Sequence, residues 1–106
     1  MTLGVHLFPQ PARLDLTDID NFRSLKVVVH GEDRDGSRLT EALRGIGWVA
    51  GASTFLGIES LKGLAGGRAH DAAWLAEFDS MVAFARSKGW VDDRGTALEA
   101  HWESAQ

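Results

Sequence analysis

The sequence has 106 residues, of which 44% are hydrophobic and 25% charged, which suits one folded domain with a single core. A net charge of −4 and scattered basic residues exclude a general nucleic-acid groove. The absence of cysteine excludes disulfides, thiolate metal sites and cysteine nucleophiles, and it agrees with a cytoplasmic location. No stretch reaches the roughly 18 apolar residues of a membrane helix, so we expect no membrane partner.

Residues 1–21 are predicted to form an extended N-terminal arm without the features of a signal peptide. Leu3–Phe8 has the length of a short strand. Pro9 and Pro11 follow it, and their missing N–H groups exclude that segment from a central strand. Thr17–Phe22 begins with a capping residue followed by acids, which predicts one helical turn at most.

The strongest strand signal is Leu25–His30, with the sequence LKVVVH. It is rich in β-branched residues and is followed by a glycine, as expected for a strand that ends in a turn. Alternation places one set of side chains toward a core, namely Leu25, Val27 and Val29. The other face then carries Lys26, Val28 and His30.

Glu32–Gly36 is predicted to be a turn, after which Ser37 caps a short helix that ends at Gly45 and Gly47. The helix buries four apolar residues, Leu39, Ala42, Leu43 and Ile46. The turn contains Asp33-x-Asp35-Gly36, which resembles part of a calcium loop. The later ligands of such a loop are missing, so the sequence favours a solvated turn.

Residues 48–67 allow two interpretations. Two strands, Trp48–Ala52 and Thr54–Ile58, would pair through a tight turn and be followed by a helical turn over Ser60–Leu64. The competing interpretation is one helix over Thr54–Leu64, in which each of its two glycines would cost about 1 kcal/mol. The glycines and the lack of a clean apolar stripe favour the strands.

The clearest helix signal is Ala69–Gly89. Its apolar residues recur with helical spacing and form one stripe: Trp74, Leu75, Phe78, Met81, Val82 and Ala85. Asp71 near the start can accept hydrogen bonds from free backbone N–H groups. Gly89 suits the left-handed residue that ends a helix. The sequence therefore predicts a long helix whose apolar face packs on a sheet.

A final hairpin is predicted after this helix. Trp90 and Val91 start it, Asp92–Gly95 forms its turn, and Thr96–Glu103 is the return strand. On the return strand one face is apolar, with Leu98, Ala100 and Trp102. The other face carries Glu99, His101 and Glu103.

The predicted element order is strand, helix, strand, strand, helix, strand. This βαββαβ order predicts a single α+β domain over residues 1–106, a two-layer sandwich of the ferredoxin-like type. Its antiparallel sheet carries both helices on one face, and the long second helix covers about residues 70–88. Such folds host many activities, so the fold class alone predicts no function.

Two groups of polar residues have the composition of a chemical site. Glu99, His101 and Glu103 lie on one strand face, and His30 could add a ligand for zinc or iron(II) from a neighbouring strand. An exposed polar face explains them more simply, so we predict no metal and no cofactor. His70 and Asp71 could act as a base and its orienting group, although capping of the helix is the simpler explanation.

Tryptophan is the third candidate, with four in the chain. Trp48, Trp90 and Trp102 lie at strand positions or ends, where they suit a pocket or an interface as well as a core.

These patterns lead to two functional hypotheses. The first is a non-catalytic binding or assembly module that forms a homodimer through its open sheet face. Its candidate interface residues are Val28, Trp48, Trp90 and Glu99. The alternative is a small cytoplasmic enzyme acting on an organic acid or aromatic compound. It would use His30, His70 or His101 as an acid–base group, with Asp71 beside His70.

Overall fold

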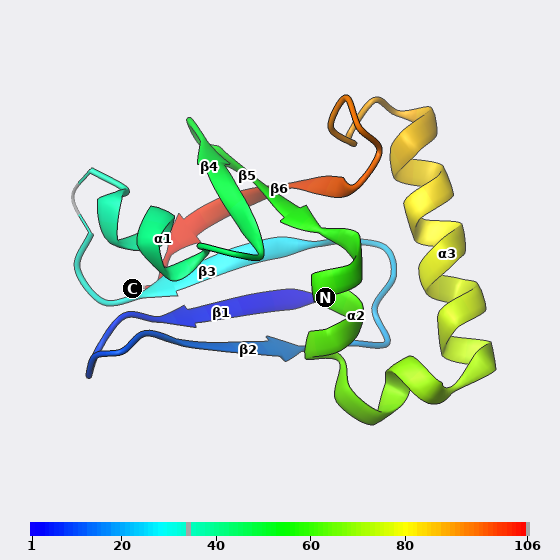
Figure 1. Ribbon diagram of the computed structural model, residues 1–106, viewed down its shortest axis with the longest axis horizontal. Coiled ribbons are helices and arrows are strands. Elements are labelled where there is room, and N and C mark those ends of the chain that lie inside the picture. The colour runs from blue at the N-terminus through cyan, green and yellow to red at the C-terminus, as the bar shows by residue number, and fades with distance from the viewer. Residues whose placement is uncertain (34, 106) are drawn as a thin grey trace.

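The computed structural model describes residues 1–33 and 35–105. Its centre is a six-stranded sheet of mixed direction, with the strand order β2-β1-β3-β6-β5-β4 (Figure 1). The strands are β1 (Thr2–His6), β2 (Arg13–Thr17), β3 (Lys26–His30), β4 (Gly47–Ala50), β5 (Ser53–Gly57) and β6 (Ala97–Ser104).

Three α-helices accompany the sheet: α1 (Ser37–Ala42), α2 (Ile58–Leu64) and α3 (Ala72–Ser87). A short 3₁₀ helix, η1 (Gly66–His70), joins α2 to α3. Figure 1 shows α3 running crosswise to the strands, whereas α1 lies at the opposite end of the sheet. None of the helices within the described residues combines the length and the hydrophobicity that crossing a bilayer requires.

The predicted ferredoxin-like sandwich is wrong. The pairs β1–β3 and β3–β6 are parallel, and only β1–β2, β4–β5 and β5–β6 are antiparallel. The sheet is therefore mixed, with three helices instead of two. Alternation along a strand shows which side chains share a face, but it does not show the direction of the neighbouring strand.

Residues 1–21, which the sequence analysis assigns to an extended arm, contain the hairpin of β1 and β2. Pro9 and Pro11 lie in its connection, where they interrupt no ladder. β1 is an interior strand, because it also pairs with β3. Thr17 ends β2 and does not start a helical turn.

The helices pack on one face of the sheet. Alternate strand residues on that face form one core with the helices. The helical part of this core consists of Leu39 of α1, Leu43 just after it, Leu61 of α2 and the apolar stripe of α3. The buried strand residues include Leu3, Val5, Val27, Val29, Leu56, Leu98 and Ala100. The predicted apolar faces of Leu25–His30 and Thr96–Glu103 are thus the ones that meet the helices.

Several predicted elements agree with the structure. The strands β4 and β5 form an antiparallel hairpin followed by α2, as the two-strand interpretation of residues 48–67 requires. In α3, four residues of the predicted stripe are buried: Trp74, Phe78, Val82 and Ala85. Asp71 caps this helix by accepting from the N–H groups of Ala73 and Trp74, at 2.9 and 3.3 Å.

The start of α1 differs in detail from the prediction. Ser37 is the first helical residue instead of the cap. The Asp33 carboxylate accepts from the backbone N–H groups of Arg38 and Leu39, at 3.1 and 2.8 Å. Asp35 accepts from the side chain of Ser37 and from its backbone N–H, and these hydrogen bonds to the charged form lower the pKa of the Asp35 carboxyl. Both aspartates therefore accept hydrogen bonds from backbone N–H groups at the start of α1.

Candidate functional site

The second face of the sheet, hereafter the open face, has no helix packed on it among the described residues. Its strand residues are exposed or half-buried, apart from Gly4 and Ala97. The register places eighteen of the described residues on it: Thr2, Gly4, His6, Arg13, Asp15, Thr17, Lys26, Val28, His30, Trp48, Ala50, Ser53, Phe55, Gly57, Ala97, Glu99, His101 and Glu103.

A histidine pair lies at one end of this face. His6 and His30 are directly opposite each other on β1 and β3, and their rings stack with centroids 4.5 Å apart. The Asp15 carboxylate lies 3.3 Å from Nε2 of His6, on the side of β2. Gly4 makes room for this contact, because a Cβ at that position would lie 2.3 Å from Oδ1 of Asp15. The candidate His30 thus belongs to a cluster of three side chains, in which His6 stacks on His30 and contacts Asp15.

An aromatic pair lies at the other side of the open face. Trp48 of β4 and Phe55 of β5 stand in register, and their rings stack at 5.3 Å with an interplanar angle of 15°. Trp48 remains 45% exposed. Glu99 stands opposite Phe55 on β6. Two of the predicted interface residues, Trp48 and Glu99, therefore flank Phe55 on the open face.

The centre of the open face is polar around Val28. Val28 is half-buried and opposite Glu103, whose carboxylate pairs with the Lys26 ammonium at 3.7 Å. His101 stands between Lys26 and Ser53. Within residues 1–33 and 35–105, no three metal-ligating side chains are grouped so that they could hold an ion. The Glu103 carboxylate forms an ion pair with Lys26 instead.

The remaining sequence candidates lie elsewhere. His70 ends η1 and is exposed, next to the capping residue Asp71. Trp102 faces the core side, is half-buried, and donates from its indole N–H to the carbonyl oxygen of Gly51 at 2.9 Å. The structure therefore does not bring His70, His30 and His101 together into one site.

A groove beside α3 is the other candidate site. One wall is the loop that connects β2 to β3, residues 18–25. Two contacts hold this loop against the helical segments: the Trp74 indole N–H donates to the carbonyl oxygen of Ile19 at 2.9 Å, and Asp20 pairs with Arg68. Within the loop, the Asn21 side-chain oxygen accepts from the Arg23 backbone N–H at 3.1 Å.

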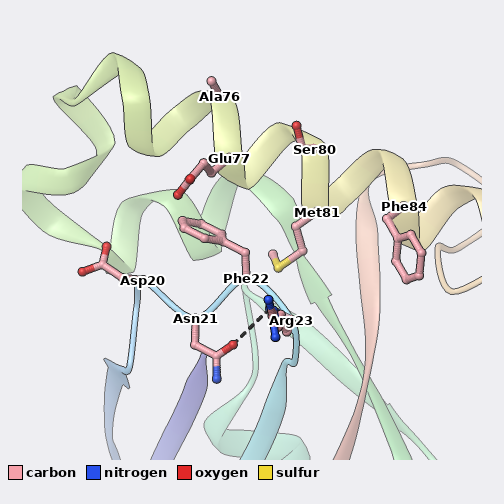
Figure 2. A pocket seen from close by; sticks show the side chains of 9 residues that line it. All are labelled: Asp20, Asn21, Phe22, Arg23, Ala76, Glu77, Ser80, Met81 and Phe84. Carbon is pink, nitrogen blue, oxygen red and sulfur yellow. Dashed lines mark hydrogen bonds between the residues drawn. The ribbon is translucent and has the colours of Figure 1, made fainter.

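Beyond these contacts the loop and α3 separate, and a cavity of about 790 Å³ opens between them. Figure 2 shows the Phe22 ring and the Met81 side chain pointing into this space. Its lining comes from both walls: Asp20, Asn21, Phe22 and Arg23 of the loop, and Ala76, Glu77, Ser80, Met81 and Phe84 of α3.

A smaller cavity of about 250 Å³ continues the groove toward Trp90. It lies where β6 changes its neighbour: His101 is opposite Lys26 of β3, whereas Leu98 is bridged to Val91. Both cavities share four lining residues, Phe22, Arg23, Met81 and Phe84. They are two parts of one groove.

Two exposed aromatic residues mark this end of the groove. Trp90 is 45% exposed and Phe84 is 56% exposed, and their rings meet edge to face at 6.0 Å. Of the predicted interface residues, Trp90 therefore belongs to the groove and not to the open face. Sequence reasoning missed Arg23, Phe22 and Phe84, because they lie in a loop and off the apolar stripe of α3.

No protein-family model matches the chain, and searches of curated proteins and of solved structures give no match.

Proposed function

We propose that this chain is a non-catalytic assembly module that self-associates through the open face. The observation that carries the proposal is an aromatic pair, the exposed Trp48 stacked on the half-buried Phe55, on a face that no helix of the described residues covers. Aromatic anchors surrounded by polar groups are typical of interfaces between folded chains. The half-buried Val28 and the adjacent Lys26–Glu103 pair supply the apolar centre and the polar surroundings.

The two sides of the open face differ in composition. The aromatic pair stands on β4 and β5, whereas β1 and β2 on the far side carry the small residues Thr2, Gly4 and Thr17 beside the polar His6, Arg13 and Asp15. A twofold axis near Val28 and parallel to the strands would place the aromatic pair of each copy over the far side of the other. Face-to-face packing of this kind sets two sheets about 10 Å apart.

Light scattering at micromolar concentration tests the proposal. Self-association through this face predicts a mass of twice 11.5 kDa for the native chain. Val28→Glu places a charge at the centre of the contact and should return the mass to that of one chain. Ala83→Glu, at an exposed position of α3, is the matched control and should leave the doubled mass unchanged.

Trp48→Ser provides a second, independent variant that removes the aromatic anchor. A dimer that survives both Val28→Glu and Trp48→Ser would use another surface, and a native chain that remains single at high concentration would refute self-association. We place this assembly in the cytoplasm, in agreement with the absence of cysteine.

A second function, an enzyme with a histidine acid–base group that acts on an organic acid or aromatic compound, has one observation in its favour. Asp15 lies within 3.3 Å of His6, whose ring stacks on His30, and a carboxylate that orients an imidazole is a common acid–base arrangement. NMR titration of the four histidines, with Asp15→Asn as the comparison, tests this function. Unaltered titration of His6 and His30 in that variant would count against it.

A further inference from the structure

We propose that the groove beside α3 binds a small aromatic carboxylate, with its ring against Trp90 and its carboxylate at Arg23. The groove and the open face share Glu99, and the proposal does not depend on self-association through the open face. The first step is the apolar part of the groove. Phe22, Met81, Phe84 and Trp90 border the smaller cavity, and its 250 Å³ exceeds the roughly 150 Å³ of an engineered apolar cavity that accepts benzene. One aromatic ring therefore fits.

The second step is the position of the charge. Among the described residues, Arg23 is the only charged one that lines both cavities, which places it where they meet. Its guanidinium has no hydrogen-bond or ion-pair partner anywhere in the described parts of the chain. A carboxylate suits a guanidinium well, because two parallel N–H donors match its two oxygens.

Among the described lining residues, each acid borders only one of the two cavities. Asp20 is paired with Arg68. Glu77 lines only the larger cavity, and Glu99 lines only the smaller one. The Lys88 ammonium, 5.5 Å from the centre of the Phe84 ring, adds positive potential at the Phe84 side of the groove. The charges thus favour an anionic group beside Arg23 over a cationic one.

The experiment compares three probes that share a phenyl ring and a three-carbon chain: 3-phenylpropionate, 3-phenylpropan-1-ol and 3-phenylpropylammonium. Binding is followed by amide and indole NMR shifts of the native chain. We expect the carboxylate to bind about tenfold more tightly than the alcohol, with the largest shifts at the Trp90 indole and residues 22–25.

Arg23→Gln should remove the advantage of the carboxylate and leave the alcohol bound as before. Arg38→Gln is the matched control, because Arg38 also lies by an exposed aromatic ring, 5.0 Å from that of Phe8, yet outside the groove. The amide spectrum of each variant shows whether it is folded.

Three results would overturn the proposal: tighter binding of the ammonium probe, shifts that centre on Phe8, or carboxylate affinity that Arg23→Gln leaves unchanged. Absence of binding by all three probes at millimolar concentration would also overturn it. A second copy of the chain as the occupant is recognised separately, because Phe84→Ala would then lower the mass in light scattering.

Discussion

The indole N–H of Trp74 donates to the carbonyl oxygen of Ile19 at 2.9 Å, across 55 positions of sequence. The same indole stacks on Phe78 at 5.1 Å and contacts Phe22 at 5.7 Å. One buried side chain therefore fixes the longest helix to the loop that forms the opposite wall of the groove. The shape of the groove depends on the packing of α3.

Phe78→Ala should lower the free energy of unfolding by about 3–5 kcal/mol, because the side chain is fully buried and its removal leaves a cavity under α3. Phe84→Ala on the same helix is the control, since Phe84 is 56% exposed and should cost below about 1 kcal/mol. Urea unfolding measures both. Equal losses would contradict the assignment of the buried face.

Asp71→Ala should cost about 1 kcal/mol, because two N–H groups at the start of α3 lose their acceptor. Asp71→Asn keeps a side-chain oxygen in place and should cost far less. Thermal unfolding of the two variants checks the prediction. A large loss in the asparagine variant would indicate that the charge of Asp71 matters more than its capping geometry.

Two glycines should respond to alanine in opposite directions. A Cβ at Gly47 would lie 2.1 Å from the carbonyl oxygen of Phe55, so Gly47→Ala must displace the β4–β5 pair and should cost about 1–3 kcal/mol. Gly63 in α2 has open space around its Cβ position. Gly63→Ala should therefore stabilise the protein by about 0.5–1 kcal/mol in chemical unfolding.

Asp92 should make the last hairpin sensitive to acid. Desolvation opposes ionisation of this carboxyl, but its hydrogen bonds with the N–H groups of Ala97 and Thr96 outweigh that effect, so its pKa is lowered. A lowered pKa in the folded state contributes stability above the ordinary aspartate value, and this stability is lost as the pH falls through the lowered value.

Melting temperatures from neutral pH to about pH 2 test this sign. Asp92→Asn should reduce the melting temperature at neutral pH and flatten its decline in acid. Asp93→Asn is the control, because Asp93 is exposed and should leave the profile of the native chain intact. An unchanged profile in Asp92→Asn would assign the acid sensitivity to other carboxylates.

Local elements of this fold can be read from the sequence because their signals are local. The stripe of α3, its Asp71 cap and the faces of Val27 and Val28 follow from spacing alone. The hairpin of β1 and β2 had a usable signal in the alternation of Leu14 and Leu16 with polar residues. The two prolines before Leu14 and the acids after Leu16 concealed that signal.

Strand neighbours could not be predicted in the same way. The parallel contacts of β3 with β1 and β6 join segments far apart in the chain, and nothing in their composition specifies direction. The same holds for the sites. Arg23 and Trp90 border the same cavity because β6 exchanges β3 for the segment at Val91, and His6 stacks on His30 through the β1–β3 register.

The interior position of β6 has a consequence for the order of folding. β6 follows the other five strands of the described residues in sequence, yet it lies between β3 and β5. Before it inserts, those two strands each present a row of unpaired backbone groups, which are templates for association with other chains. The step that completes the sheet also requires closure of long loops, which slows it. Intermediates that lack β6 should therefore be the species most prone to aggregate during refolding.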